Sequence, residues 1–134
     1  MTKPEIIGGM RSSYTRVACM ACEEKGIDYT LTDVLLGAPE LRALHPLGKM
    51  PVLRHDGLVL FESKAIATYL DKAFAGPALI PSEPRLLGLV EQWVSYVNTV
   101  VDPMLVRTYL LAYAAPKTAD GKPDRVLIDA VLPS

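Results

Sequence analysis

The fold is decided by residues 45–70, which read HPLGKMPVLRHDGLVLFESKAIATYL. Two short apolar runs in this stretch, Val52–His55 and Leu58–Phe61, are separated by Asp56-Gly57. That dipeptide accepts positive φ angles and favours a tight turn between paired strands. The stretch therefore predicts an antiparallel β-hairpin.

The residues Met50 and Pro51 precede the first strand of this hairpin. Proline has no N–H to give to a ladder, which places Pro51 at the head of the strand, and a proline in such a tight turn is a candidate for the cis isomer. We expect the backbone N–H and C=O of Met50 to face outward. Such a pair holds an extended, peptide-like ligand by strand addition, without a requirement on the side chain.

A helix is predicted to begin at Ser63, because the apolar residues after it recur at spacings of three and four. A helix N-terminus binds anions such as a carboxylate, to which the Ser63 hydroxyl adds a bond, while Glu62 is placed to pair with an ammonium group. The pair suits an α-amino-carboxylate head. Alternatively, Ser63 is only an N-cap and Glu62 only a favourable acid of the first turn. The apolar residues are Ala65, Ile66, Tyr69, Leu70, Ala73 and Phe74.

The residues before the hairpin predict alternating strands and helices. A strand is expected at Glu5–Gly9, a helix at Thr15–Lys25 ended by Gly26, a strand at Tyr29–Val34 and a short helix at Pro39–Leu44. A strand-helix-strand unit of this length favours a parallel pair with a right-handed crossover. Together with the hairpin, this predicts a mixed four-stranded sheet.

After Pro81 the pattern changes to that of one long helix. Its apolar residues follow helical spacing, and a bend is expected near Pro103. Such a stripe is more often part of a core than a cofactor site. Its members are Leu86, Val90, Trp93, Val97, Val100, Met104 and Leu105.

Taken in order from Glu5 to Pro81, these pieces resemble the N-terminal domain of the glutathione S-transferases, a thioredoxin-like fold. The pieces are IIGG at 6–9, SSYTR at 12–16, EEKGI at 23–27, the segment 45–53 and ESKAIATYL at 62–70. The resemblance implies an α/β, thioredoxin-like βαβ-ββα domain at 1–81 that binds glutathione. It also implies a partial all-helical C-terminal domain at 85–134.

The resemblance further implies a glutathione transferase, which ionises the glutathione thiol for attack on a small hydrophobic electrophile. Members of the family activate the thiol with a hydroxyl or a cysteine at the start of the first helix, where the dipole favours the thiolate. Ser12 is expected to be this group, with Ser13 and Tyr14 as alternatives. A role of Ser12 or Ser13 as a plain helix N-cap is the structural alternative. Glutathione is the expected co-substrate, and no metal is expected.

The glutathione-binding residues implied by the resemblance are Lys49, Met50, Pro51, Glu62 and Ser63. Met50 and Pro51 would hold the peptide middle of glutathione, and Glu62 and Ser63 its γ-glutamyl end. Lys49 would reach the glycine carboxylate, although a surface lysine is the ordinary expectation at such a position.

Cys19 and Cys22 form a Cys-x-x-Cys pattern well inside the predicted first helix. A redox dithiol begins at the helix N-terminus, where the dipole lowers the first thiol's pKa, so we expect these two to be small buried residues. Two cysteines alone do not make a tetrahedral zinc site. His45 and His55 flank separate turns, and solvated or loop-stabilising roles are expected for them.

The composition excludes several classes of protein. Hydrophobic residues make up 50% and charged residues 22% of the chain, which is typical of a globular protein. A net charge of −1 without a basic run argues against a nucleic-acid or anionic-membrane surface. The first apolar run is too short for a signal peptide, and the longest apolar region is interrupted by polar residues. A cytoplasmic protein is expected.

The 134 residues end inside an apparent helix at 124–132, whereas members of the resembled family run to roughly 200 residues. We therefore expect a fragment or a truncated gene product, with an exposed apolar patch around Val90, Trp93 and Leu105. Family members are usually homodimers, and the Ser63 helix and the long helix over 86–113 are the expected interface elements.

Other functions stay open at this point. One is a non-catalytic, glutathione-transferase-like binding or regulatory module, and another is a thiol-disulfide oxidoreductase that uses Cys19 and Cys22. A glutathione-dependent isomerase or peroxidase would use the same site. The electrophilic substrate is not specified by the sequence.

Overall fold

The computed structural model describes residues 2–114 and 118–131. The chain divides into two compact units, Met1–Ser82 and Glu83–Ser134. The first unit contains a sheet with helices, and the described part of the second is helical.

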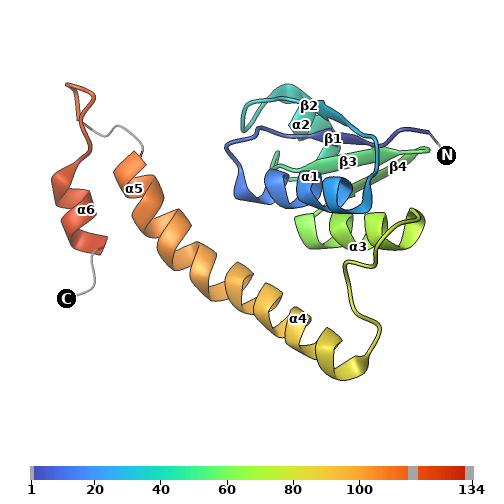
Figure 1. Ribbon diagram of the computed structural model, residues 1–134. Coiled ribbons are helices and arrows are strands. Elements are labelled where there is room, and N and C mark those ends of the chain that lie inside the picture. The colour runs from blue at the N-terminus through green and yellow to red at the C-terminus, as the bar shows by residue number, and fades with distance from the viewer. Residues whose placement is uncertain (1, 115–117, 132–134) are drawn as a thin grey trace. The chain divides into compact units, whose positions relative to one another are not determined.

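The first unit is built on a mixed four-stranded sheet with the strand order β2-β1-β3-β4. β1 runs parallel to β2, and the pairs β1–β3 and β3–β4 are antiparallel (Figure 1). This confirms the predicted thioredoxin-like arrangement. The elements are β1 (Glu5–Ile7), α1 (Ser13–Lys25), β2 (Thr30–Thr32), α2 (Pro39–Leu44), β3 (Val52–His55), β4 (Leu58–Phe61) and α3 (Ser63–Ala73).

The structure contains the turn, the cis bond and the helix end that the sequence predicted. Asp56 and Gly57 both have positive φ angles, 46° and 81°, in the hairpin turn, and the Met50–Pro51 peptide bond is cis. Gly26 ends α1 in the left-handed conformation. The first strand is shorter than predicted, because the backbone turns after Gly8 and Ser12 N–H donates to the Gly9 carbonyl at 3.0 Å.

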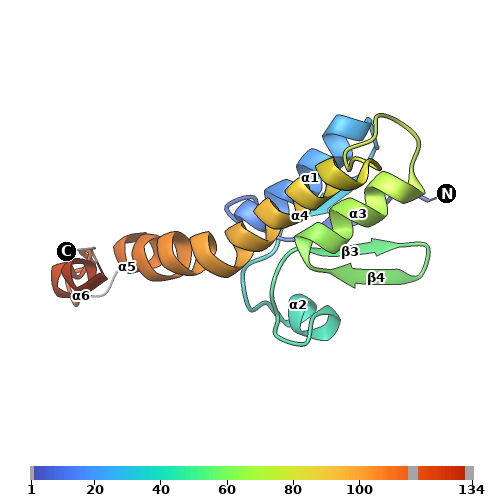
Figure 2. The same cartoon turned by 90° about the horizontal axis from the view of Figure 1, so that it is seen from below.

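The two faces of the sheet are covered by different helices. Ile6 and Leu53 point to the face that α1 and α3 cover, where they are fully buried. Their neighbours Ile7 and Val52 point to the opposite face and pack against Leu41 of α2. This alternation is the two-residue period of a strand. Figures 1 and 2 both show α1 and α3 side by side.

A buried ion pair joins the ends of α1 and α3. The ammonium of Lys25 lies 3.3 Å from a carboxylate oxygen of Asp71, and each side chain is only 1% exposed. Lys25 also donates to the carbonyl of Pro77 at 2.9 Å, and Leu79 N–H donates to Asp71 at 2.8 Å. The Lys72 ammonium approaches the other Asp71 oxygen at 3.0 Å. The Lys25–Asp71 pair therefore connects α1, α3 and the segment after α3.

This arrangement makes the stability of the first unit sensitive to acid. The hydrogen bond from Leu79 N–H is the largest cause that lowers the Asp71 pKa from its ordinary 3.8 to about 2, and Lys72 and Lys25 lower it further. A carboxyl whose pKa is lower in the folded state stabilises the fold above its unfolded pKa, and that contribution is lost as the pH falls. We expect acid titrations of unfolding to show the loss between about pH 4 and about pH 2. The Asp71→Asn variant should lack this segment of the pH dependence.

The second unit consists of helices in its described part: α4 (Pro84–Tyr96), η1 (Val97–Leu110), α5 (Leu111–Ala114) and α6 (Arg125–Val131). The carboxylate of Glu83 caps α4 by accepting from Arg85 N–H and Leu86 N–H at 2.9 and 2.8 Å. The long helix predicted after Pro81 is thus present. The predicted terminal helix is α6, and Leu132 lies outside the described residues.

The winding of the helix changes around Pro103, where the sequence predicted a bend. Residues of η1 form a π-helix, in which hydrogen bonds reach five residues back, and Pro103 lies inside it. The side chains follow the same spacing: Arg107 pairs with Asp102 at 2.8 Å, and the Thr108 hydroxyl donates to the Pro103 carbonyl at 2.7 Å. The wider turn accommodates a residue that has no N–H to donate.

Large apolar side chains are exposed along the long helix. Trp93 is 60% and Leu105 58% exposed, as predicted, whereas Val90 is half-buried. Trp93 contacts Tyr96 edge to face, with ring centroids 5.9 Å apart. Within residues 2–114 and 118–131, no helix combines the length and the apolar character needed to cross a membrane.

Candidate functional site

The strand register brings three separate segments to one end of the sheet. Ile7 pairs with Val52, and Val52 pairs with Phe61. Gly8 follows Ile7, Pro51 precedes Val52 and Glu62 follows Phe61. These three residues are therefore neighbours across the sheet. The helices α1 and α3 both begin at this end (Figure 1). Two helix N-termini and the start of β3, which carry the residues that the sequence proposed for its site, thus lie at one end of the sheet.

Ser12 is the N-cap of α1. Its Oγ accepts a hydrogen bond from Thr15 N–H at 3.2 Å, and its backbone is extended, with φ −75° and ψ 122°. The side chain is half-buried. Because Oγ accepts from the helix, the hydroxyl hydrogen is left to donate to a ligand atom. The capping role and a role toward a ligand are therefore compatible in Ser12.

The two alternatives to Ser12 occupy the first turn of α1. Ser13 is the first helical residue and is exposed, and Tyr14 follows it and is half-buried. Neither residue is the N-cap. Both nevertheless lie at the positive end of the same helix dipole.

Met50 is tied to the loop between β1 and α1. The Gly9 N–H donates to the sulfur of Met50 at 3.1 Å, and the Met50 side chain is half-buried. The Met50 side chain is thus used within the protein. Pro51, next to it, is buried.

The start of α3 differs in one detail from the prediction. Glu62, and not Ser63, occupies the N-cap position, and the Glu62 side chain makes no capping hydrogen bond. Glu62 is exposed and has φ 70° and ψ 114°, a conformation that side-chain-bearing residues rarely adopt. Such backbone strain costs about 1–3 kcal/mol and concentrates at functional sites. Ser63 is 8% exposed and is the first helical residue, so its interpretation as an N-cap is wrong.

Lys49 lies at the edge of this region, in the segment between α2 and β3, and is exposed. The segment before it is held by His45, whose Nδ1 accepts from Leu47 N–H and whose carbonyl accepts from Gly48 N–H, both at 2.9 Å. The predicted loop-stabilising role of His45 is confirmed. His55 is also buried and structural, bonded to the Tyr69 hydroxyl and the Thr2 carbonyl.

The cysteines lie away from the start of α1, and they are not exposed. Cys19 is 4% exposed and Cys22 is fully buried. Burial raises the pKa of both thiols, that of Cys22 to about 12. A thiol-disulfide oxidoreductase needs an accessible thiol with a low pKa, so this candidate function is wrong. Among the described residues, no group of three or more histidine, cysteine or acidic side chains is placed to hold a metal ion.

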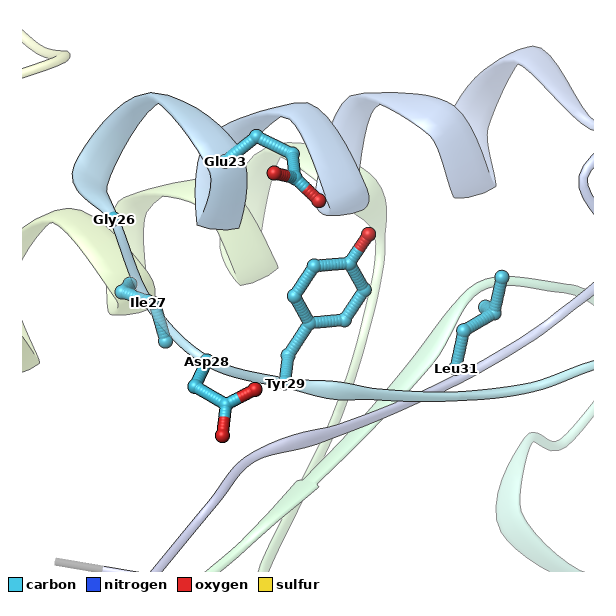
Figure 3. A pocket seen from close by; sticks show the side chains of 6 residues that line it. All are labelled: Glu23, Gly26, Ile27, Asp28, Tyr29 and Leu31. Atoms are coloured by element: carbon cyan, nitrogen blue, oxygen red, sulfur yellow. The ribbon is translucent and has the colours of Figure 1, made fainter.

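A shallow hollow lies at the opposite end of α1. Figure 3 shows the Tyr29 ring between the helix and the strand, with its hydroxyl beside the carboxylate of Glu23. Burial is the largest cause that raises the pKa of Tyr29, followed by hydrogen bonds to Cys19 and Glu23. The hollow is lined by Glu23, Gly26, Ile27, Asp28, Tyr29 and Leu31. It was not expected from the sequence, and it lies at the C-terminal end of α1, whereas Ser12 caps the other end.

A comparison with protein families decides the identity of this fold. Residues 7–78, more than half of the chain, match the model of the glutathione S-transferase N-terminal domain. The chain belongs to the glutathione S-transferase family. All eight residues that the sequence proposed for the site of this glutathione S-transferase fold lie within the matched segment.

Two relatives show how much of each chain the similarity covers. The chain is 32% identical to a probable glutathione S-transferase of Solanum tuberosum over 101 residues, which are 73% of this chain and 46% of the relative. It is 28% identical to the maleylacetoacetate isomerase of Rattus norvegicus over 109 residues, covering 76% of this chain and 50% of the relative. The chain thus spans about half the length of the curated relatives it matches.

A solved structure extends the similarity to nearly the whole chain. The theta class glutathione S-transferase of Xanthomonas axonopodis pv. citri, solved with glutathione bound, is 32% identical and has a TM-score of 0.80. The match covers 98% of this chain and 64% of that one. The thioredoxin-like first unit and the helical region after it are therefore both features of known glutathione S-transferases.

Proposed function

We propose that this chain binds glutathione where β1, β3 and β4 converge, and that it activates the thiol for attack on a small hydrophobic electrophile. One observation supports this assignment above the others. The register brings the start of β3 to the end of the sheet at which α1 and α3 begin, so this end offers backbone groups for a peptide and dipoles for its negative charges.

In the proposed complex, the α-carboxylate of the γ-glutamyl group lies at the start of α3, near Ser63. The ammonium group of the γ-glutamyl end pairs with the exposed carboxylate of Glu62. The strained backbone of Glu62 holds this residue beside the helix start. The peptide middle pairs with the backbone of Met50 before Pro51. Lys49 reaches the glycine carboxylate.

Ser12 then faces the sulfur. Its hydroxyl donates a hydrogen bond to the thiolate, and the N-terminus of α1 favours the negative charge. A fall of one unit in the thiol pKa corresponds to about 1.4 kcal/mol, so one hydroxyl and a dipole are sufficient for a useful shift. The thiol proton is lost to solvent. The thiolate electron pair forms a bond to the electrophilic carbon, and either a leaving group departs with its bonding pair or an added proton from water completes the product.

A glutathione-dependent isomerase is the second candidate, and it is favoured by the similarity to a maleylacetoacetate isomerase. The same thiolate would add to a carbon–carbon double bond and depart after rotation about the resulting single bond. The first half of this reaction needs the same ionised thiol as the transfer. Assays with both substrate types separate the two functions.

The organisation of the protein is part of the proposal. Residues 1–81 would form the glutathione-binding domain and 85–134 a partial helical domain. The active form would be a homodimer in the cytoplasm, where reduced glutathione is maintained. The buried, unpaired state of both cysteines suits a reducing compartment.

Thermal unfolding with and without glutathione tests the binding. A ligand that binds only the folded protein, at a hundred times its dissociation constant, adds about 2.7 kcal/mol to the free energy of unfolding. We expect a concentration-dependent rise of the melting temperature with glutathione. Cysteinylglycine lacks the γ-glutamyl end and should give a much smaller rise at equal concentration. The absence of any shift up to millimolar glutathione would contradict the proposal.

A further inference from the structure

Thr15 lies beneath the loop that carries Ser12. Its side chain is fully buried, and its backbone N–H is the donor that holds the Ser12 oxygen at 3.2 Å. Among the described residues, the Thr15 hydroxyl oxygen has no hydrogen-bond partner. It is thus a buried polar group in direct contact with the proposed site.

The Thr15 hydroxyl lies close to Gly8, the residue that follows β1. A Cβ atom placed on Gly8 would lie 2.6 Å from the Thr15 hydroxyl oxygen, nearer than real Cβ atoms approach another atom. It would also lie 3.2 Å from the Thr15 methyl carbon and 3.2 Å from the Met50 Cβ. Gly8 therefore fits between Thr15 and Met50 only because it lacks a side chain. The space left by the missing side chain lies at the start of the loop over 8–12.

Fold stability alone does not favour a threonine here. A buried hydroxyl without a partner is destabilising, and valine has nearly the same shape without that hydroxyl. Valine, however, would put a methyl group in place of the smaller oxygen on the side that faces Gly8. Extra atoms in a packed site displace the backbone, which is also destabilising. The unpaired hydroxyl favours valine and the tight packing favours threonine, so stability does not distinguish the two residues. The expected difference between them is the placement of the loop that carries Ser12.

We propose that Thr15 is a positioning residue for Ser12. Its backbone N–H fixes the Ser12 oxygen, and its compact hydroxyl lets Gly8, and with it the loop to Ser12, lie close to the start of α1. This proposal rests on the proposed function, because it concerns the direction in which Ser12 donates to the glutathione thiolate. A displaced loop would leave glutathione bound but its sulfur less stabilised.

The test measures the ultraviolet absorption of the thiolate in the glutathione complex against pH, for wild type, Thr15→Val and Thr15→Ser. In Thr15→Val we expect the midpoint to rise by about one unit, which means about tenfold less thiolate below the midpoint. The dissociation constant of glutathione should change less than about threefold, or under about 0.7 kcal/mol. Thr15→Ser keeps the hydroxyl and should restore the wild-type midpoint. Thr99→Val, a threonine of η1, serves as the matched control.

The same measurement in a Ser12→Ala background shows whether Thr15 acts through Ser12. There Thr15→Val should shift the midpoint no further, because coupled residues are not additive. An unchanged midpoint in Thr15→Val, an equal shift in Thr15→Ser, or a full shift without Ser12 would each overturn the proposal. If Thr15→Val does not fold, Thr15→Ala adds no atom against Gly8 and should keep the wild-type midpoint, and a rise of about one unit in Thr15→Ala would overturn the proposal. A wild-type protein that does not lower the glutathione pKa would instead refute the proposed function.

Discussion

Replacing Asp71 with alanine is expected to lower the free energy of unfolding of the first unit by about 3–5 kcal/mol. The Lys25 ammonium is 1% exposed, and among the described residues it would keep only the Pro77 carbonyl as a close partner. Leu79 N–H would lose its acceptor as well. Removal of one member of a buried ion pair leaves an uncompensated charge, and that cost exceeds the value of the pair itself.

Chemical denaturation followed by circular dichroism measures this loss. Asp28→Ala is the matched control, because the Lys3–Asp28 pair at 2.7 Å has side chains that are 46% and 86% exposed. Exposed pairs of this kind contribute about 0–1 kcal/mol. A loss of less than about 1 kcal/mol in Asp71→Ala would contradict the prediction.

A double variant separates the buried charge from the lost packing. Lys25→Met removes the ammonium and keeps most of the side-chain volume. Combined with Asp71→Ala, it should restore part of the lost stability, since no unpaired charge is then buried. A double variant less stable than Asp71→Ala alone would show that packing, and not charge, dominates at this point.

Local sequence signals were sufficient for much of the fold. Asp56-Gly57 gave the hairpin with its strand limits, Pro39 marked the start of α2, and Gly26 ended α1. Each of these signals acts through the backbone of its own segment. The resemblance joined the segments into one sheet, and the structure contains the expected mixed four-stranded sheet.

Features that depend on contacts distant in sequence were not predictable in the same way. The Lys25–Asp71 pair joins residues 46 positions apart, and nothing in either helix alone indicates a buried charge. The contact between Thr15 and Gly8 depends on how α1 lies on β1. The strained conformation of Glu62 is likewise a property of the assembled sheet end, since glutamate has no local preference for it.

For the candidate site, the sequence named residues that the register brings to one end of the sheet. It did not distinguish their roles. Ser63 was expected as a possible cap, but the cap position belongs to Glu62. A Ser-x-x-Thr spacing is the one local signal of a link between Ser12 and Thr15, because an N-cap oxygen accepts from the N–H three residues later.

The second large effect is expected from Ser12→Ala. We expect conjugation of glutathione to fall by about 10²-fold or more, the usual consequence of removing one hydrogen-bond donor to a developing or resident anion. The dissociation constant of glutathione should change little, because in the proposed complex the peptide is held by the backbone of Met50 and by the start of α3. Loss of the cap itself costs about 1 kcal/mol of stability, which thermal unfolding will report separately.

Ser13→Ala and Tyr14→Phe are the matched comparisons, since both residues lie in the first turn of the same helix. If Ser12 contacts the sulfur, these variants retain most of the conjugation rate, and only Ser12→Ala raises the pH midpoint of the thiolate. Unaltered turnover in Ser12→Ala, with a loss in Tyr14→Phe, would transfer the role to the phenol. The thiolate absorption gives the same discrimination without an electrophile, because it depends only on glutathione and the first unit. The assignment of the sulfur contact can therefore be decided on the 134-residue chain itself.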